Sequence, residues 1–248
     1  MNIGIIGSGG MGACLASKFV KLGHTVDIAN ARGPASLRPF AEQIGAQAAT
    51  VEETTIDKKV IVVSIPQKNI PDLPKHLFTQ LPKDVVAIDT GNYYPTLRDG
   101  AIRGLQHSDI DSLWVQEQIG FPVVKVFNSI LADSIRDLGR PKGEKHRIAI
   151  AVSGDDIKAK EVAFRLVDEL GFDPFDIGPI IQSWQQQPGS PIYCRDIGLD
   201  ELKKRVDAMV GASWAEMRKK IIAKRTSDEA LMSADYPAYL KSLQDDKY

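Results

Sequence analysis

Cysteine and histidine are scarce in this sequence, which limits the chemistry that its side chains can perform. The 248 residues include two cysteines and four histidines. Two cysteines as far apart as Cys14 and Cys194 do not form a metal-ligand cluster, so we expect no metal site. Cys194 is either a reactive thiol or a small half-buried residue, and we favour the second interpretation.

Long apolar runs and an excess of one charge are also missing. No apolar run approaches the roughly 18–20 residues that a membrane-spanning helix needs. Asn2–Ile6 follows a strand pattern rather than that of a secretion signal. Lysine and arginine total 31 and aspartate and glutamate 32, which gives a formal net charge of −1. Because nothing here suggests electrostatic binding to nucleic acid, we expect a cytoplasmic protein that binds neither nucleic acids nor membranes.

What the sequence does contain is an alternation of short apolar runs and amphipathic segments. Strands that alternate with helices favour βαβ units and a parallel sheet. Continuous apolar runs such as Val60–Val63 are typical of strands covered on both faces. The sequence therefore predicts an α/β fold of the Rossmann type, doubly wound around a mainly parallel sheet. The predicted strands are 3–6, 25–29, 47–51, 60–65, 85–89, 123–127, 147–152 and 174–177, and the predicted helices are 10–22, 34–44, 70–81, 112–118, 129–138 and 155–170.

A glycine-rich loop joins the first predicted strand to the first predicted helix. It reads Gly7-Ser8-Gly9-Gly10-Met11-Gly12, which is the G-x-G-x-x-G spacing in the context that a dinucleotide-binding loop requires. The first glycine permits the tight turn, the second lets the backbone approach a diphosphate, and the last lets the helix pack closely on the strand. The free amides of Gly10 and Met11, at the positive end of the helix, then face the anion.

The end of the second predicted strand indicates which dinucleotide is bound. NAD-binding proteins place a carboxylate there, which bonds to the ribose hydroxyls. This chain has Asn30, followed by Arg32 and then by Ser36 and Arg38. An asparagine does not repel the additional phosphate of NADP, and a guanidinium binds phosphate through charge-assisted hydrogen bonds. We therefore predict NADP as the cofactor, held by Asn30 and Arg32, with help from Ser36 and Arg38.

Two more loops begin at strand ends that should face the cofactor. One is Ser64-Ile65-Pro66 and the other is Thr90-Gly91-Asn92. Ligands of open parallel sheets bind beyond the carboxyl ends of the strands, so these residues are candidate contacts to the ribose and the nicotinamide. Asn92 either contacts the cofactor or forms the turn beside Gly91, and both interpretations stay open.

The composition changes near residue 179, where polar, loop-like sequence replaces the alternating pattern. A long helix is predicted at Leu199–Ala223, followed by a polar tail after Thr226. We expect residues 1–178 to form an NADP-binding Rossmann domain and residues 179–248 to form a small helical segment for substrate binding or dimerisation. That segment is too small for a rich core of its own, so we expect it to pack on the first part or on a partner subunit.

With these segments identified, the chain resembles the family of 8-hydroxy-5-deazaflavin-dependent NADP reductases, whose relatives include the cytosolic reductase domain of six-transmembrane metalloreductases. The resemblance implies hydride transfer between NADP(H) and a deazaflavin or flavin-like partner whose ring stacks on the nicotinamide, and it implies a homodimer. Gln185 departs from the pattern, because relatives often carry arginine after the tryptophan of this segment. The matching segments are the glycine loop and residues 30–34, 64–66, 89–95, 125–130, 153–156 and 183–189.

Candidates for acid–base chemistry are few. Alcohol oxidation needs a general base near the reacting hydroxyl, and His107, in a polar loop, is the one histidine that we do not exclude. Hydride passage between stacked redox rings mainly needs distance, orientation and a dry pocket. Asn128 could orient the nicotinamide or the acceptor ring. Lys125 could protonate a substrate or form a structural ion pair, and Tyr93 could wall the ring pocket or simply fill space.

Three functions remain open at this point. The leading one is an NADP-dependent oxidoreductase that moves hydride to or from a deazaflavin or flavin. The second is a reductase of a small imine or carbonyl compound, with Lys125, His107 or Tyr93 as the proton donor. The third is a non-catalytic NADP-binding redox sensor that acts through its carboxyl-terminal segment.

Overall fold

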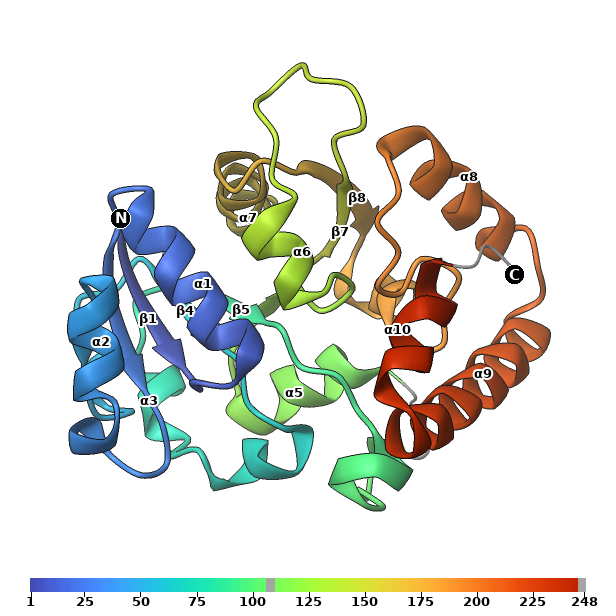
Figure 1. Cartoon of the computed structure of the whole chain (residues 1–248). Helices are drawn as coiled ribbons and strands as arrows, with labels where there is room; N and C mark the ends of the chain where they lie inside the picture. The colour runs from blue at the N-terminus through green and yellow to red at the C-terminus, as the bar shows by residue number, and fades with distance from the viewer. Residues whose placement is uncertain (106–109, 245–248) are drawn as a thin grey trace.

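The chain folds around one eight-stranded sheet with the order β3-β2-β1-β4-β5-β6-β7-β8 (Figure 1). This computed structural model describes residues 1–105 and 110–244. Strands β1 to β6 are parallel, β7 is antiparallel to β6, and β8 is parallel to β7. The predicted Rossmann-type fold with a mainly parallel sheet is confirmed. The strands are β1 (Asn2–Ile6), β2 (Thr25–Ala29), β3 (Gln47–Ala48), β4 (Val60–Val63), β5 (Val86–Asp89), β6 (Val123–Lys125), β7 (Ala149–Ser153) and β8 (Asp173–Gly178).

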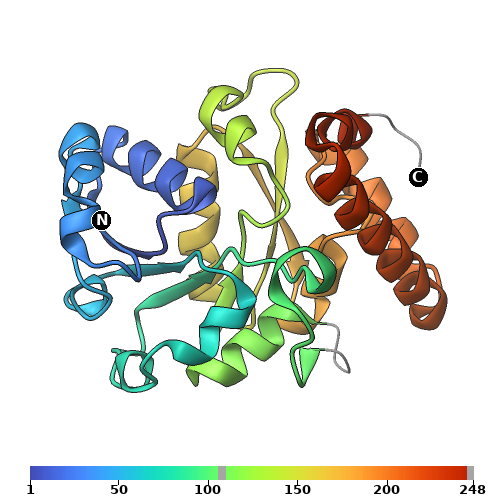
Figure 2. The ribbon, with the colours of Figure 1, turned by 60° about the horizontal axis from the view of Figure 1, so that its bottom comes forward.

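Helices cover both faces of the sheet (Figure 2), and the buried side chains of a strand alternate between the core clusters on these faces. Val60 and Val62 belong to one core cluster, whereas Ile61 and Val63 belong to the other, as the two-residue period of a strand requires. The first cluster is closed by α1 (Gly10–Lys21), α2 (Arg38–Ile44), α6 (Ala132–Asp137) and α7 (Ile157–Glu169), and the second by α3 (His76–Thr79) and α5 (Asp111–Ile119).

Prolines divide two of the predicted helices. The segment 34–44 consists of a 3-10 turn (Pro34–Ser36) and then α2, which restarts with Pro39 in its first turn. The segment 70–81 consists of a 3-10 turn (Gln67–Asp72) and the single turn α3. A proline supplies no backbone N–H and clashes with the preceding turn, so it interrupts the helical hydrogen bonds.

The last part of the chain differs most from the prediction. The predicted single helix Leu199–Ala223 is wrong, because α8 (Leu199–Val210) ends before Gly211 and α9 (Trp214–Ala234) begins after it. Ser213 caps α9 by accepting a hydrogen bond from the Glu216 amide at 3.3 Å, which is the N-cap pattern that starts a new helix. The tail is also helical, since α9 runs well past Thr226 and α10 (Tyr236–Gln244) follows it.

The carboxyl-terminal helices pack against the end of the sheet rather than around a core of their own. Ala149 and Ala151 of β7 share a core cluster with Leu202 and Val206 of α8 and Met217 of α9. The boundary at residue 178 stays a prediction. Within the described residues, no helix is both long enough and apolar enough to cross a membrane.

Candidate functional site

Five parallel strands end along one edge of the sheet, and the segments that follow them form the candidate site. The strand order reverses between β1 and β4, and open α/β sheets bind ligands in the crevice at such a reversal, beyond the carboxyl ends of the strands. The structure therefore brings most of the predicted cofactor contacts to one edge. The segments are residues 7–12 after β1, 30–36 after β2, 64–67 after β4, 90–94 after β5 and 126–131 after β6.

The glycine loop is tightly folded on its inner side and open on its outer side. Gly7 has φ +116° and donates its amide to the Ala29 carbonyl at 2.8 Å. A Cβ at Gly7 would lie 2.1 Å from the Ser64 carbonyl oxygen, and a Cβ at Gly12 would lie 2.1 Å from the Gly7 carbonyl oxygen. At Gly9, by contrast, an added Cβ would meet nothing within 4 Å. The outer side is thus the side from which a ligand can approach the backbone.

The start of α1 is built to face an anion. Its N-cap residue, Gly9, provides no side-chain cap, and Gly9 and Gly10 are exposed. The first amides of a helix have no partner within the helix and carry the positive end of its dipole. Ser8 is half-buried beside them, and the half-buried Met11 packs on the core below. An anionic diphosphate, as in NADP, fits this arrangement.

Asn30 organises the turn after β2 through its uncharged side chain. Its Oδ1 accepts hydrogen bonds from the Arg32 amide at 2.9 Å and from the Ser36 hydroxyl at 3.2 Å, while its Nδ2 donates to the Ser8 hydroxyl at 3.3 Å. The Arg32 and Arg38 side chains are exposed beside this turn. The turn therefore joins the glycine loop to an exposed guanidinium, which is what a phosphate on the ribose would need.

An apolar cavity of about 370 Å³ opens between the glycine loop and the segment after β4. Its lining includes the apolar side chains of Ile6, Ile65 and Leu73. Polar groups come from Asn30, Asn69, Glu52 and Asp72. Ligand pockets commonly combine apolar walls with a few polar groups that fix orientation. A flat heteroaromatic base fits this position, next to the Asn30 turn.

The segments after β4 and β5 are joined by hydroxyl groups. The Thr90 hydroxyl donates to the Ser64 hydroxyl at 3.0 Å, and Pro66 precedes the 3-10 turn that begins at Gln67. Gly91 differs from the expectation, because it is buried and its amide donates to Asp89 Oδ1 at 2.7 Å. Gly91 therefore supports the loop from inside rather than facing the crevice.

Two asparagines from neighbouring strand ends form a closed pair. Asn128 Nδ2 donates to Asn92 Oδ1 at 3.1 Å, and Asn92 Nδ2 donates to the Asn128 carbonyl oxygen at 3.0 Å. Asn128 is 2% exposed, and its Oδ1 is buried without a hydrogen-bond partner. Asn92 thus ties β5 to β6 at the crevice edge, and its contact with the cofactor stays a prediction.

Lys125 is a buried structural cation and does not reach the crevice. Its side chain is 0% exposed, and its Nζ lies 3.0 Å from Asp89 Oδ2 and also donates to the Gly91 carbonyl. Ser112 donates to the same carboxylate oxygen at 2.7 Å. Of the two roles considered for Lys125, these contacts support the structural ion pair, because a fully buried, paired ammonium does not contact a substrate in this structure.

Tyr93 is also turned into the protein. Its hydroxyl donates to the Gly100 carbonyl at 2.9 Å and accepts from the Ile102 amide at 3.2 Å. The Arg225 guanidinium of α9 lies over its ring, 5.4 Å from the centroid. Of the two roles considered for Tyr93, these contacts support that of a residue that fills space in the interior. His107, the remaining candidate proton donor, lies outside the described residues.

The carboxyl-terminal segment contributes to the site from the same chain. Asn128 Nδ2 donates to the Gln186 carbonyl at 2.7 Å, and Asn92 Nδ2 donates to the Tyr193 hydroxyl at 3.1 Å. Sequence reasoning missed both residues, since each lies more than fifty positions from its partner in an irregular segment. The available signals were the matching segment 183–189, which contains Gln186, and Tyr193 itself, a tyrosine in a stretch otherwise typical of a loop.

Burial also raises the pKa of a carboxyl group that the sequence analysis did not select. Asp111, at the start of α5, accepts a hydrogen bond from the Tyr93 amide at 3.0 Å through one oxygen, while the other has no partner. Burial raises the pKa of Asp111 to about 6, although the Lys125 and Arg225 cations oppose that shift. Asp111 therefore belongs to the buried charge network below the crevice.

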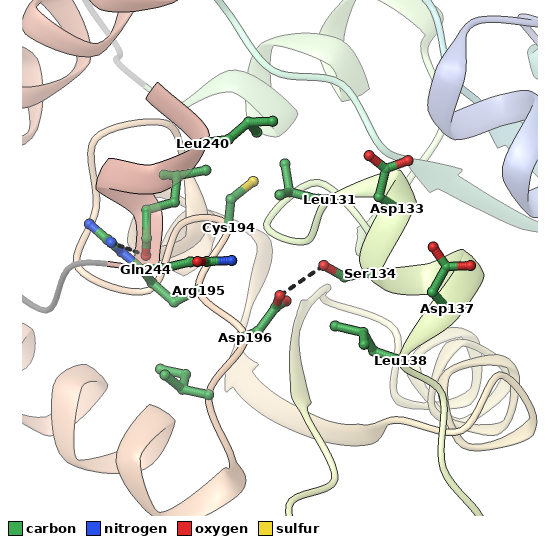
Figure 3. A pocket seen from close by; sticks show the side chains of 12 residues that line it. Leu131, Asp133, Ser134, Asp137, Leu138, Cys194, Arg195, Asp196, Leu240 and Gln244 are labelled. Atoms are coloured by element: carbon green, nitrogen blue, oxygen red, sulfur yellow. Dashed lines mark hydrogen bonds between the residues drawn. The ribbon is translucent and has the colours of Figure 1, made fainter. Parts of the chain in front are cut away.

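A larger cavity of about 580 Å³ lies between α6, α10 and residues 194–197 (Figure 3). Leu131, Cys194 and Leu240 gather on one side of it, and Ser134 donates to Asp196 at 2.9 Å on the other. Burial raises the pKa of Asp196. The Cys194 amide donates to the Ser129 carbonyl at 2.9 Å, so this cavity adjoins the segment that carries Asn128.

Comparison with known proteins agrees with the geometry of the amino-terminal part. Residues 2–93 match the family described as NADP oxidoreductase, coenzyme F420-dependent. Over 56 residues the chain is 48% identical to protein YjhV of Escherichia coli (strain K12), and the match covers 23% of this chain and 41% of that protein. The chain therefore spans less than half the length of the curated relative that it matches.

Solved structures resemble a larger part of the chain. Protein SMa0349 of Sinorhizobium meliloti, which has no assigned function, is 27% identical, with a TM-score of 0.65 over 78% of this chain and 94% of that one. A provisionally named F420-dependent NADP reductase of Arthrobacter sp. FB24 is 22% identical, with a TM-score of 0.60 over 74% of this chain and 87% of that one. The second likeness shows the fold alone. The solved structures thus support the fold, and the match over residues 2–93 is the finding that points to NADP-dependent oxidoreduction.

Proposed function

We propose that this chain is an NADP(H)-dependent oxidoreductase that transfers hydride between NADP(H) and a deazaflavin or flavin-type acceptor. The observation that carries the proposal is the open amino end of α1 at Gly9 together with the adjoining Asn30 turn. The first provides amides for a diphosphate, and the second provides an uncharged ribose contact beside the Arg32 guanidinium.

The protein's own residues act by binding and orientation. When bound, the cofactor supplies or receives a hydride at its nicotinamide ring, so the protein needs to hold two rings in contact and exclude water. The interlocked Asn92 and Asn128 side chains provide a fixed polar wall where β5 and β6 end. Lys125 and Tyr93 are engaged elsewhere, which favours an acceptor whose reduction needs little help from a protein acid.

The acceptor side of the site carries no arginine at position 185. Gln185 is buried and donates to Gln182 Oε1 at 2.8 Å. The cavity that adjoins the Asn128 segment is lined by Asp133, Asp137, Asp196 and Arg195, and Arg136 pairs with both Asp133 and Asp137. Because position 185 supplies no arginine to bind an acidic tail, we propose that the acceptor is a flavin-type ring with a short or weakly charged substituent rather than a long acidic one.

The assembly is part of the proposal as well. We propose a homodimer, as the resemblance to deazaflavin-dependent reductases implies. The hydrogen bonds from Asn92 to Tyr193 and from Asn128 to Gln186 lie within one chain. We therefore propose that each subunit completes its own site and that the dimer is not needed to supply these residues.

The test is anaerobic oxidation of NADPH with a panel of acceptors: the 8-hydroxy-5-deazaflavin, FMN, FAD, a quinone and a ferric chelate. We expect turnover with at least one flavin-type ring. The matched control is Gly9→Glu, which should fold because an added Cβ meets nothing within 4 Å there, but which places a carboxylate against the diphosphate. Tight NADPH binding without oxidation by any acceptor would overturn the catalytic proposal and favour a sensor.

A further inference from the structure

We propose that Tyr193 is a positioning residue of the hydride-transfer site, because it fixes the side-chain amide of Asn92 at the edge of the crevice. The inference rests on the proposed function for its kinetic consequence. The geometric part stands on the hydrogen bonds and burial of Tyr193, Asn92 and Asn128, and it can be measured without any cofactor.

The hydrogen-bond donors of the asparagine pair are fully used. Asn92 Nδ2 donates to the Asn128 carbonyl at 3.0 Å and to the Tyr193 hydroxyl at 3.1 Å. Asn128 Nδ2 donates to Asn92 Oδ1 at 3.1 Å and to the Gln186 carbonyl at 2.7 Å. An amide NH₂ has two donors, so no N–H of the pair is left over. Asn128 Oδ1 is the one buried amide oxygen of the pair that lacks a partner.

Tyr193 is held in place from several directions. It is 5% exposed, its amide donates to the Ser190 carbonyl at 3.1 Å, and the next amide, that of Cys194, donates to the Ser129 carbonyl at 2.9 Å. Cys194 has φ +50°, a left-handed conformation that fixes a sharp turn. The backbone therefore carries the tyrosine ring into the site from the segment that leads to α8.

The Tyr193 hydroxyl stays protonated and has a second partner. Burial raises the pKa of Tyr193 well above its usual range, so the neutral phenol is the form present at ordinary pH. Its oxygen also forms a hydrogen bond with the Tyr94 hydroxyl. Tyr94 contacts Tyr193 but makes no hydrogen bond with Asn92 among the described residues. The two tyrosines are thus similar in burial and differ in their contact with the asparagine pair.

The consequence is that the asparagine pair can accept hydrogen bonds from a ligand but has no free donor for one. With all N–H groups of the pair occupied, only its oxygens can bind a ligand. Asn128 Oδ1 is buried, so the half-buried Asn92 offers its Oδ1, and a group that binds there has to bring a donor. The carboxamide of a nicotinamide has such a donor. If Tyr193 loses its hydroxyl, the Asn92 side chain keeps only its hydrogen bonds with Asn128 and gains rotational freedom. Misplacement of such a group lowers the rate of the chemical step.

The test compares Tyr193→Phe with Tyr94→Phe, which remove the same shared hydrogen bond and preserve both rings. In the protein without cofactor, the Asn92 side-chain amide protons are followed by NMR, assigned through Asn92→Asp. We expect these protons to exchange with solvent about tenfold faster in Tyr193→Phe and at a nearly unchanged rate in Tyr94→Phe. Thermal unfolding of both variants checks that they are folded.

The kinetic arm uses the oxidation of NADPH by whichever of the deazaflavin, FMN and FAD the wild-type protein turns over fastest. We expect kcat to fall about tenfold in Tyr193→Phe and less than about threefold in Tyr94→Phe, with KM for NADPH nearly unchanged in both. Equal losses in the two variants, or unchanged exchange of the Asn92 amide in Tyr193→Phe, would overturn the positioning role. A wild-type protein that does not oxidise NADPH would overturn the proposed function, while the NMR comparison would still decide the role of Tyr193.

Discussion

At the scale of single residues, Asn30 shows how one neutral side chain can prepare a phosphate site. Its Oδ1 holds the Arg32 amide and the Ser36 hydroxyl, bonds that an aspartate in its place could also accept. An aspartate would add a negative charge next to the exposed Arg32 side chain. The neutral amide therefore shapes the turn and leaves the guanidinium available to an anion.

The first prediction concerns Arg32. Arg32→Ala should weaken NADPH binding about tenfold and leave NADH binding nearly unchanged, because the lost hydrogen bonds go to the additional phosphate. Titration with each nucleotide, followed by fluorescence, measures the two dissociation constants. Arg165→Ala removes an equally exposed arginine on α7 and is the control. Equal losses for NADPH and NADH would contradict the assignment of Arg32.

The second prediction concerns Asp111, whose pKa is raised from 3.8 to about 6 by burial. Because the folded pKa lies above the unfolded one, the folded state holds the proton longer. The contribution of Asp111 to stability is therefore largest below about pH 4 and declines up to about pH 6. Relative to wild type, Asp111→Asn should gain about 2 kcal/mol of unfolding free energy between pH 4 and pH 7.

Urea denaturation of wild type and Asp111→Asn across that pH range provides the measurement. The difference between the two proteins is the relevant quantity, since other groups titrate in both. The exposed Asp72→Asn is the control and should show no such trend. A constant difference between pH 4 and pH 7 would mean that Asp111 has an ordinary pKa.

At the scale of elements, α9 stabilises the loop that follows β5. Glu229 is 1% exposed, and its Oε2 accepts hydrogen bonds from the Thr96 amide at 2.7 Å, the Thr96 hydroxyl at 2.6 Å and the Leu97 amide at 2.7 Å. Those groups begin the π-helical turn Pro95–Asp99. A carboxylate at the amino end of a turn satisfies donors that otherwise have no partner.

The third prediction follows from that contact. Glu229→Ala should lower the free energy of unfolding by about 3 kcal/mol, because it removes the charge-assisted hydrogen bonds that the buried carboxylate accepts from Thr96 and Leu97. Hydrogen exchange of Thr96 and Leu97 should become faster in the variant, since their amides lose their acceptor. Ser227→Ala changes an exposed position of the same helix and is the control. Unchanged exchange at Thr96 would show that the turn forms without α9.

The elements of the first 178 residues could largely be predicted from the sequence, and so could a helix that begins at Leu199, whereas the division of the last part into three helices could not. Continuous apolar runs predict strands such as β4, and the glycine loop predicts the first connection from strand to helix. The break between α8 and α9 depends on Gly211 and on the Ser213 cap, which a helical periodicity search passes over. The candidate cofactor contacts lie at strand ends and could be selected, but Tyr193 and Gln186 reach the candidate site through tertiary packing alone.

At the scale of the whole molecule, the sheet and the carboxyl-terminal helices share their core. Ala149 and Ala151 of β7 pack with Leu202 and Met217, and Tyr94 packs with Tyr239 of α10. Removing the last helices would expose apolar side chains of the sheet to water. Burial of such surface contributes about 25 cal/mol per Å², so the two parts should unfold together.

The fourth prediction tests that statement. A fragment of residues 1–178 should show no cooperative thermal transition, while the full chain should show one. Circular dichroism and calorimetry of the two proteins provide the measurement. A fragment that melts cooperatively at the temperature of the full chain would mean that residue 178 is a true domain boundary.

The reversed direction of β7 has one more effect on the architecture. Because β7 and β8 run against β6, the chain leaves the sheet at Gly178 heading away from the ligand edge and has to travel back before Tyr193 can reach Asn92. Residues 179–192 form that return path, and their number therefore determines how far the Tyr193 side chain reaches toward Asn92. Inserting or deleting a residue there would shift a distant side chain at the catalytic edge without altering a single strand.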